Sequence, residues 1–254
     1  MTPGSDSAPL VRVSELTLAY GANVIQRDLN FEIRPREVLA IVGPSGCGKS
    51  TLLRHLVGLE TPDQGRVMYG EQDLHHCDDE ALASLRRQFG VTFQAGALWS
   101  SMTVGENIML PLRLFTPLDK SARELNARYK LALVGLDGSF DLEPSALSGG
   151  MRKRAAIARA LALDPLLLYL DEPSSGLDPF STARLDELIL NLRRYLGTTV
   201  VMVTHAIESV FAIADRLMFL DPVEKTMTAL DSPQNLVDHG PERVREFLHR
   251  GPRK

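Results

Sequence analysis

The sequence predicts an α/β fold whose centre is a mainly parallel β-sheet. Two observations lead to this prediction. In the second half of the chain, short and continuously apolar segments alternate with helical patterns, which is typical of parallel strands buried on both faces. In the first half, a glycine-rich loop over 43–50 connects an apolar segment to a helical pattern. Open sheets of this kind bind their ligands at the carboxyl ends of the strands.

The first half of the chain is expected to begin with a flexible tail over residues 1–9, which are small and polar. Apolar and β-branched runs bounded by glycine and proline then predict strands, and apolar residues at helical spacing predict helices. The predicted strands are 10–20, 29–35, 37–42, 66–69 and 90–94, and the predicted helices are 50–59 and 78–89.

The second half begins with a stretch, about 95–160, whose pattern is helical and irregular, and we interpret it as an inserted helical subdomain. Buried strands and helices alternate after it: strands 164–173, 198–205 and 217–221, and helices 181–196 and 206–216. We expect one domain over 10–240. A short C-terminal helical extension over 241–254, with a basic end, is expected to complete the chain.

The composition is that of a globular protein with a substantial core. Of the 254 residues, 44% are hydrophobic, and the net charge of −4 argues against a general nucleic-acid binder, which is usually basic. Cys47 and Cys77 form no CxxC pair and suit a reducing cytosol. No signal-peptide pattern is visible, and the apolar runs are far shorter than the roughly 18 residues of a membrane span. The chain is not expected to cross a membrane by itself, although it could dock on one.

The segment GPSGCGKS fits the phosphate-binding pattern G-x-x-x-x-G-K-[ST] in full and lies between a predicted strand and a predicted helix. Its glycines allow consecutive backbone N–H groups to face phosphate oxygens, and the helix N-terminus adds partial positive charge. Lys49 is expected to reach the β- and γ-phosphates, and the Ser50 hydroxyl to ligate Mg²⁺. Cys47 is interpreted as a small filler rather than a redox sensor. The predicted nucleotide-binding residues here are Gly43, Pro44, Ser45, Gly46, Cys47, Gly48, Lys49, Ser50 and Thr51.

Polar residues follow the predicted strands where a nucleotide would lie. Asp171 and Glu172 end one buried strand, which suits Mg²⁺ binding by the first and orientation or deprotonation of an attacking water by the second. An ordinary Asp-Glu-Pro turn is the alternative. His205 ends the next strand and could donate to a γ-phosphate. The Gln94 amide could bind the lytic water and a metal-bound water, and the Tyr20 ring could stack on adenine, although both could also be plain strand residues.

The stretch LSGGMRKRAAIARA breaks the usual rules for a helix start, because two glycines and three cations stand in its first turns. Ser148 can cap this helix, and Gly149 and Gly150 expose N–H groups, so the start is suited to a second phosphate. We therefore predict a dimer in which each nucleotide lies between the phosphate loop of one chain and this segment of the other. Part of the basic trio 152–154 is expected to pair with acids or lie near phosphate, with membrane or nucleic-acid contact as the alternative.

Together, GPSGCGKST, Gln94, LSGGM, LLLYLDEP, SSGLDP and His205, in this order, resemble the ATP-binding-cassette (ABC) ATPase family over 10–236. The resemblance implies a RecA-like P-loop NTPase core, with a mainly parallel sheet and an antiparallel β subdomain, plus an inserted α-helical subdomain. It implies Mg-dependent ATP hydrolysis by a homodimer. Met151 stands where the family usually has glutamine, and activity is expected to persist. The implied roles are adenine stacking by Tyr20, Walker A by 43–51, Q-loop by Gln94, signature by 148–150, Walker B and catalytic glutamate by Asp171 and Glu172, D-loop by Asp178, and switch histidine by His205.

A narrower similarity is carried by FQAGALWSSMTVGENIMLPLR, by the methionine of LSGGM and by VREFL near the end. These segments are similar to Mla-type ATPases, which serve MCE-protein systems that move phospholipids between bacterial membranes. That similarity implies a membrane permease dimer gripped near Gln94, a periplasmic MCE protein, often a small cytoplasmic regulatory subunit, and a place at the cytoplasmic face of the inner membrane. A long C-terminal clasp is not expected. The alternatives are the ATPase of a small-solute importer and a soluble ABC protein acting on DNA or ribosomes.

Overall fold

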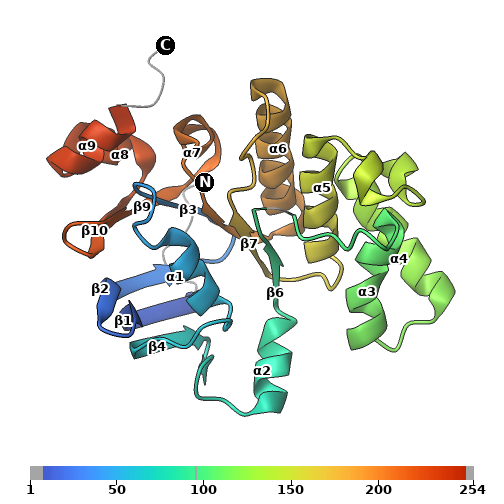
Figure 1. The fold of residues 1–254 in the computed structure, drawn as a ribbon, viewed down its shortest axis with the longest axis horizontal. Helices are drawn as coiled ribbons and strands as arrows, with labels where there is room; N and C mark the ends of the chain where they lie inside the picture. The colour runs from blue at the N-terminus through green and yellow to red at the C-terminus, as the bar shows by residue number, and fades with distance from the viewer. Residues whose placement is uncertain (1–7, 95, 250–254) are drawn as a thin grey trace.

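The computed structural model describes residues 8–94 and 96–249, and within them the centre of the fold is a six-stranded sheet (Figure 1). Neighbouring strands are parallel, except that the edge strand β10 is antiparallel to β9. The predicted, mainly parallel sheet is therefore confirmed. Its strands lie in the order β10 (Thr226–Asp231), β9 (Arg216–Asp221), β3 (Val38–Val42), β8 (Thr199–Val203), β7 (Leu167–Asp171) and β6 (Phe89–Thr92).

The inner strands are continuously apolar because both faces of this sheet are covered. Along β3, Val38, Ala40 and Val42 belong to one hydrophobic core, whereas the alternate residues Leu39 and Ile41 belong to the other. Side chains of a strand alternate between faces, so a strand between two cores needs an apolar residue at every position. The same alternation holds for β7 and β8.

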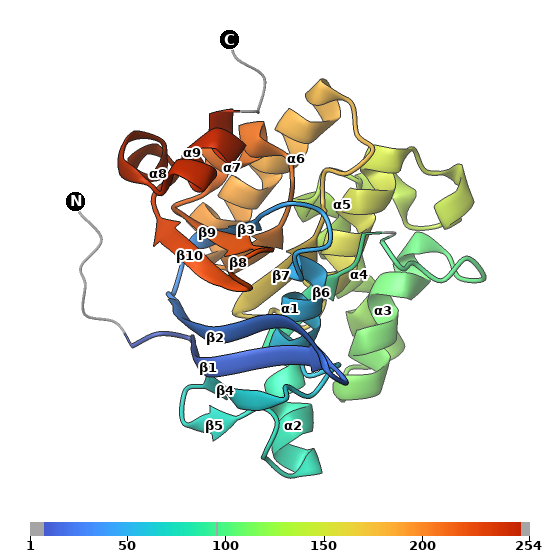
Figure 2. The same ribbon diagram turned by 60° about the vertical axis from the view of Figure 1, so that its left-hand side comes forward.

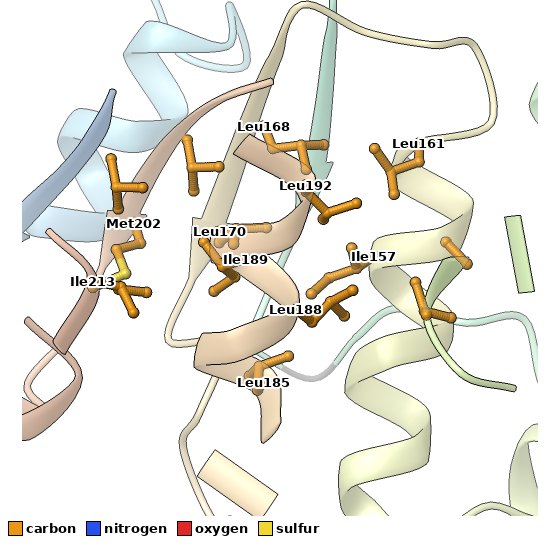
Figure 3. Packing of buried hydrophobic residues seen from close by; sticks show 14 of the residues in the cluster. Ile157, Leu161, Leu168, Leu170, Leu185, Leu188, Ile189, Leu192, Met202 and Ile213 are labelled. Atoms are coloured by element: carbon orange, nitrogen blue, oxygen red, sulfur yellow. The ribbon is translucent and has the colours of Figure 1, made fainter. Parts of the chain in front are cut away.

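One core lies under the helices that follow the sheet strands in the second half of the chain. They are α6 (Pro179–Asn191), which continues as a π-helical turn over Leu192–Leu196, α7 (Ile207–Ile213), α8 (Pro233–His239) and α9 (Glu242–His249). Figure 3 shows that α6 supplies apolar residues at helical spacing, which pack between the sheet and α5 (Gly149–Ala160). The labelled residues of α6 and its turn are Leu185, Leu188, Ile189 and Leu192, those of the strands are Leu168, Leu170 and Met202, and Ile157 of α5 and Leu161 just after it complete the contact.

The other core lies between the main sheet, helix α1 (Lys49–Leu56) and a four-stranded antiparallel sheet, which Figure 2 shows from the side. The smaller sheet has the order β2 (Asn23–Ile33), β1 (Val11–Tyr20), β4 (Gln64–Tyr69) and β5 (Gln72–Asp73). It is the antiparallel β subdomain that the family resemblance implied.

Two strands extend beyond the sequence-based expectation. The prediction placed the start of β2 at residue 29, but β2 begins at Asn23, because β1 and β2 pair as a hairpin down to the contact of Tyr20 with Asn23. The added residues are largely polar and mostly not buried, so they carry no apolar signal. The edge strand β10 was not predicted, and its residues are partly exposed throughout. Backbone pairing with a neighbour, rather than burial, makes both segments strands.

Helices occupy the stretch that was expected to be a helical subdomain. Helices α3 (Val104–Phe115), α4 (Lys120–Leu133) and α5 (Gly149–Ala160) pack on one another beside β6 and β7, with short 3₁₀ turns at Asp137–Ser139 and Pro144–Ala146 (Figures 1 and 2). Thr103 and Glu106 form a capping box at the start of α3. A further helix, α2 (Asp79–Arg86), is capped by the Asp78 side chain and connects β5 to β6.

The C-terminal helices are fixed to the main sheet near the end of β9. The Arg243 guanidinium of α9 donates to both carboxylate oxygens of Asp221 at 2.8 Å, and Phe247 packs edge-on against Phe219 at 5.2 Å between ring centroids. The expected flexible tail lies outside the described residues over 1–7, as does the basic end over 250–254. Within the described part of the chain, no helix is long and apolar enough to cross a membrane.

Candidate active site

The glycine-rich loop joins the end of β3 to the start of α1, as predicted, and its shape requires glycine at two positions. Gly43 has φ 151°, and a Cβ there would lie 2.5 Å from the Leu220 carbonyl oxygen. Gly48 has φ 100°, and a Cβ there would lie 2.6 Å from Cγ2 of Ile25. Without side chains at these two positions, the loop can lie close against β9 and β2, while Ser45 and Gly46 at its tip remain exposed.

Lys49 is buried and turned back into its own loop. Its Nζ donates to the carbonyl oxygens of Gly43 at 2.9 Å and Pro44 at 3.0 Å. The ammonium group is thus held beside the place where the loop N–H groups would receive phosphate. Cys47 is a loop residue whose side chain is buried. This burial raises the pKa of its thiol, which supports its interpretation as a filler rather than a redox sensor.

Ser50 and Asp171 meet although 121 positions separate them in the chain. The Ser50 hydroxyl at the start of α1 donates to Oδ1 of Asp171, the last residue of β7, at 3.0 Å. Burial raises the pKa of Asp171, and the hydrogen bond from Ser50 opposes that rise. Within the described ranges, no three His, Cys, Asp or Glu side chains gather into a metal cluster. One hydroxyl and one carboxylate beside a phosphate loop fit Mg²⁺, which takes few protein ligands and completes its shell with phosphate and water.

Glu172 follows Asp171 in a strained conformation and faces His205. Its φ is 48°, in the left-handed region that is costly for a residue with a Cβ, and its N–H donates to the Val203 carbonyl at 2.8 Å. Oε2 of Glu172 lies 2.7 Å from Nδ1 of His205. The contact is a close approach of the carboxyl and imidazole groups rather than an aligned hydrogen bond, because this buried oxygen has no hydrogen-bond partner among the residues that the structure describes.

A cavity of about 800 Å³ lies at the carboxyl edge of the main sheet, between the phosphate loop, the loop after β7 and helices α6 and α7. His205 lines it, whereas Lys49, Ser50, Asp171 and Glu172 are not among its lining residues. The phosphate loop contributes Gly43, Pro44 and Ser45 to its lining, the loop after β7 contributes 174–177, and His205 stands on the far side. The cavity therefore brings together residues from three separate strand ends, at the edge where parallel sheets bind ligands.

The segment 148–150 does not line this cavity. Ser148 caps α5 by accepting from the Met151 N–H at 3.3 Å, as predicted, and Ser148 and Gly149 are exposed. A Cβ on Gly150 would lie 3.6 Å from Ser181, so the start of α5 lies beside the first turn of α6. Asp178 caps α6 through hydrogen bonds from the Ser181 N–H at 2.9 Å and hydroxyl at 2.6 Å. The two predicted phosphate sites thus belong to separate elements, the loop before α1 and the start of α5.

Gln94 and Tyr20 are not among the residues that line the cavity. Gln94 follows β6, and its side chain is exposed. Tyr20 ends β1 with its ring 53% exposed, and its hydroxyl donates to Glu60 at 2.8 Å. An aromatic ring fixed at one end and open on its faces can accept a stacked base.

Sequence reasoning missed Gln26. This side chain of β2 is fully buried, and its Nε2 donates to the Cys47 carbonyl at 2.7 Å and to the Asp221 carbonyl at 3.2 Å. It therefore fixes the phosphate loop to β9. A lone glutamine in a strand gives no signal for such a role, since the partners are backbone atoms of distant segments.

Part of the basic trio was expected to pair with acids or lie near phosphate. Burial lowers the pKa of Lys153, and the nearby Glu172 and Asp171 oppose this, so Lys153 lies near acids. Lys153 donates to the carbonyl oxygens of Gln94 and Glu172, the latter at 3.0 Å. Arg154 donates to those of Val134 at 2.9 Å and Gly135 at 3.0 Å. Lys153 and Arg154 therefore both donate to backbone carbonyls. A count of charges along the sequence cannot detect such contacts.

A phosphate loop between β3 and α1, acids at the end of β7 and a histidine after β8 define a P-loop nucleotide-hydrolysing protein. Residues 26–175 match the family model described as ABC transporter, and the chain belongs to that family as an ATP-hydrolysing cassette.

Relatives of the whole cassette agree with this assignment. The Intermembrane phospholipid transport system ATP-binding protein MlaF of Haemophilus influenzae is 37% identical over 94% of this chain and 90% of its own length. The protein of the same name in Escherichia coli K12 is 38% identical over 95% and 89%. The Probable ribonucleotide transport ATP-binding protein mkl of Mycobacterium tuberculosis is also 38% identical, over 98% of this chain and 68% of its own length.

Solved structures agree as well. The ATP-binding cassette MJ0796, in a dimeric post-hydrolysis state bound to ADP and Pi, has a TM-score of 0.79 and 30% identity, and covers 87% of this chain and 98% of its own. The protein cbiO1 of Clostridium perfringens, described as part of the ABC transporter complex cbiONQ, has a TM-score of 0.83 and 27% identity, and the match covers 96% of both chains.

Proposed function

We propose that this chain is the ATPase motor subunit of an Mla-type system that transports phospholipids between the inner and outer membranes. The observation that carries the proposal is the match to the two MlaF proteins, which extends over 94–95% of this chain and 89–90% of theirs. The mkl protein is equally similar, but the chain covers only 68% of its length. An importer of ribonucleotides or another small solute is therefore the second candidate.

In the proposed mechanism, residues 43–51, including Lys49, bind the triphosphate of ATP, and Tyr20 stacks on its adenine. Ser50, Asp171 and Gln94 would hold Mg²⁺, which supplies positive charge to the β- and γ-phosphates when bound. The hydrogen bond between Ser50 and Asp171 supports this ligand set, because it already places both oxygens side by side.

Glu172 accepts a proton from the attacking water in this mechanism, and the Gln94 amide helps to hold that water. Oxygen of the water bonds to the γ-phosphorus, the bond from phosphorus to ADP breaks, and ADP and phosphate leave. His205 donates to the γ-phosphate, and its 2.7 Å approach to Glu172 supports a shared task for the two side chains.

Two copies of the chain complete each site in this proposal. Ser148, Gly149 and Gly150 of one copy would cap the γ-phosphate bound to the other copy, with Asp178 at the interface. The proposal is supported by the dimeric state of the related cassette MJ0796. We assign 10–240 to the ATPase domain, about 95–160 to its helical subdomain, and 241–254 to the extension.

The permease is proposed to dock in a groove beside the segment that follows Gln94. This groove, of about 430 Å³, lies between the loop before α3 and the facing sides of α3 and α4. Its lining combines Met102, Met109 and Leu110 with three cations, Arg113, Lys120 and Arg123, and the carboxylate of Glu106. A short, partly apolar and acidic cytoplasmic segment of the permease fits this chemistry.

Such docking places the chain at the cytoplasmic face of the inner membrane, with an MCE protein on the periplasmic side of the permease and a small cytoplasmic regulatory subunit as further partners.

The complex purified in mild detergent with the tagged chain tests the cargo. We expect phospholipids in the complex by mass spectrometry, and ATP-dependent movement of labelled phospholipid between vesicles that contain it. The Glu172→Gln variant is the control that lacks turnover. Uptake of ribonucleotides by the reconstituted complex, without phospholipid movement, would overturn the proposal in favour of the importer.

A further inference from the structure

Lys153 connects two segments that the proposed mechanism uses separately. Its ammonium group donates to the carbonyl oxygen of Gln94, after β6, and to that of Glu172, after β7, the second at 3.0 Å. Lys153 itself belongs to α5, in the helical stretch between β6 and β7. One side chain of α5 therefore binds the backbone of both the Q-loop and Glu172.

The surrounding contacts fix α5 closely against the Q-loop. Arg159, two turns further along α5, donates to the carbonyl oxygens of Gly96 and Ala97. A Cβ on Gly96 would lie 3.6 Å from Cβ of Ala156, which stands between Lys153 and Arg159 on α5. This face of α5 therefore binds the carbonyl oxygens of Gln94, Gly96 and Ala97, and it lies close to the Q-loop backbone at Gly96. A displacement of the loop must displace the ammonium group of Lys153 or break its bond to Gln94.

The Glu172 end of the bridge acts on a strained residue. Glu172 has φ 48°, and its carbonyl accepts from Lys153 and from the Ser175 N–H at 3.2 Å. Hydrogen bonds to a charged donor are stronger than those between neutral groups, so Lys153 helps to hold this peptide in its uncommon conformation. The direction of the carboxylate toward His205 depends on that backbone conformation.

We infer that Lys153 is a positioning residue for ATP hydrolysis, which couples the Q-loop to the backbone of Glu172. This inference rests on the role proposed above for Glu172. Without the ammonium group, Glu172 can leave its left-handed conformation and turn its carboxylate from the reacting water, while the phosphate loop remains intact. The chain would then bind ATP but hydrolyse it slowly.

Arg154 provides a matched comparison on the next position of the same helix. Arg154 also donates to two backbone carbonyls, but these belong to Val134 and Gly135, directly after α4. Loss of Arg154 therefore removes a similar pair of hydrogen bonds without touching the Q-loop or Glu172. The exposed Arg152 controls for loss of one positive charge from α5.

The experiment compares Lys153→Met, Lys153→Gln, Lys153→Arg, Arg154→Met and Arg152→Met in the full chain, purified with its membrane complex. Steady-state ATPase assays give kcat and KM, and thermal unfolding gives Tm. We expect Lys153→Met to lower kcat about tenfold or more with KM changed by less than about threefold. Lys153→Arg should recover most of the kcat, since the guanidinium keeps the charge and several donors. Arg154→Met should lower Tm with little change in kcat, and Arg152→Met should change neither.

The inference is wrong if Lys153→Met retains the kcat of Arg152→Met, or if its loss of rate follows a loss of Tm and of ATP affinity as in Arg154→Met. If Lys153→Met does not fold, Lys153→Gln answers the same question below its Tm. The role of Glu172 is tested apart from this by Glu172→Gln. If that variant stops turnover while the Lys153 variants hydrolyse normally, only the coupling fails, and if it hydrolyses normally the mechanism itself fails.

Discussion

Nδ1 of His205 lies 2.7 Å from Oε2 of Glu172. This contact connects the segments that follow the adjacent strands β8 and β7. The carboxylate side chain is only 12% exposed, whereas the imidazole is 66% exposed. The histidine thus reaches from the open side of the cavity to a carboxylate that is largely withdrawn from solvent. A buried carboxylate oxygen without an aligned hydrogen bond is costly in a structural role, which favours a role in chemistry.

We predict that Glu172→Gln stops turnover and leaves ATP bound. The substitution removes the group that orients and deprotonates water but leaves Lys49 and the phosphate loop unchanged. Loss of a general base lowers kcat by about 10²- to 10⁴-fold. Phosphate release measures the rate, and calorimetry measures nucleotide binding. Full hydrolysis by this variant would contradict the role of Glu172.

His205→Ala is expected to lower kcat by about tenfold or more, because Glu172 loses its neighbour and the γ-phosphate loses a donor. Residues that act as one unit are not additive, so the double variant should be no more than about twofold slower than Glu172→Gln alone. The same phosphate-release assay measures all three variants. Independent, multiplying effects would show that the 2.7 Å approach has no catalytic consequence.

Gln26→Leu tests the connection from the phosphate loop to β9. The substitution keeps an apolar stem but removes both hydrogen bonds of Nε2, which should lower the free energy of unfolding by about 1–3 kcal/mol. ATP affinity should fall with it, since the loop loses the contact at the Cys47 carbonyl. Chemical denaturation and calorimetry measure the two effects. Gln72→Leu, at an exposed position, is the matched control and should alter neither.

Arg243→Met is expected to lower the Tm at neutral pH. Burial raises the pKa of Asp221, but the hydrogen bonds from Arg243 and from the Val223 and Glu224 N–H groups outweigh this, so the pKa of Asp221 is lowered. A carboxylate with a lowered pKa stabilises the fold above its unfolded pKa, about 3.9, and loses that contribution as the pH falls through its folded pKa.

The difference in Tm between the wild-type chain and Arg243→Met should therefore be largest near pH 7. It should close when the pH falls below about 4, as Asp221 becomes protonated. Thermal unfolding followed over this pH range measures the difference. Arg245→Met removes an exposed cation from the same helix and serves as the control. A difference that persists undiminished in acid would place the effect of Arg243 elsewhere.

Elements with a strong local pattern were predicted well. The strands around Ile41, Leu170 and Met202 are almost continuously apolar because both sheet faces are buried, and this signal is visible in the sequence alone. The strand start at Asn23 and the edge strand β10 carry no such signal, since pairing with a neighbour decides them. The role of Ser148 as a helix cap was predicted because capping depends on only a few neighbouring residues.

The sequence by itself determined which chemical groups are present and in what order: a phosphate loop, acids after one strand, a histidine after the next and a glycine-rich helix start. Only the tertiary structure decided which of them meet. It joins Ser50 to Asp171 and His205 to Glu172, places Gly150 beside Ser181 of α6, and directs the Lys153 ammonium group to the carbonyls of Gln94 and Glu172. The physical reason is that motifs follow from local backbone and side-chain chemistry, whereas contacts between distant segments depend on how the sheet and helices pack, which no local pattern encodes.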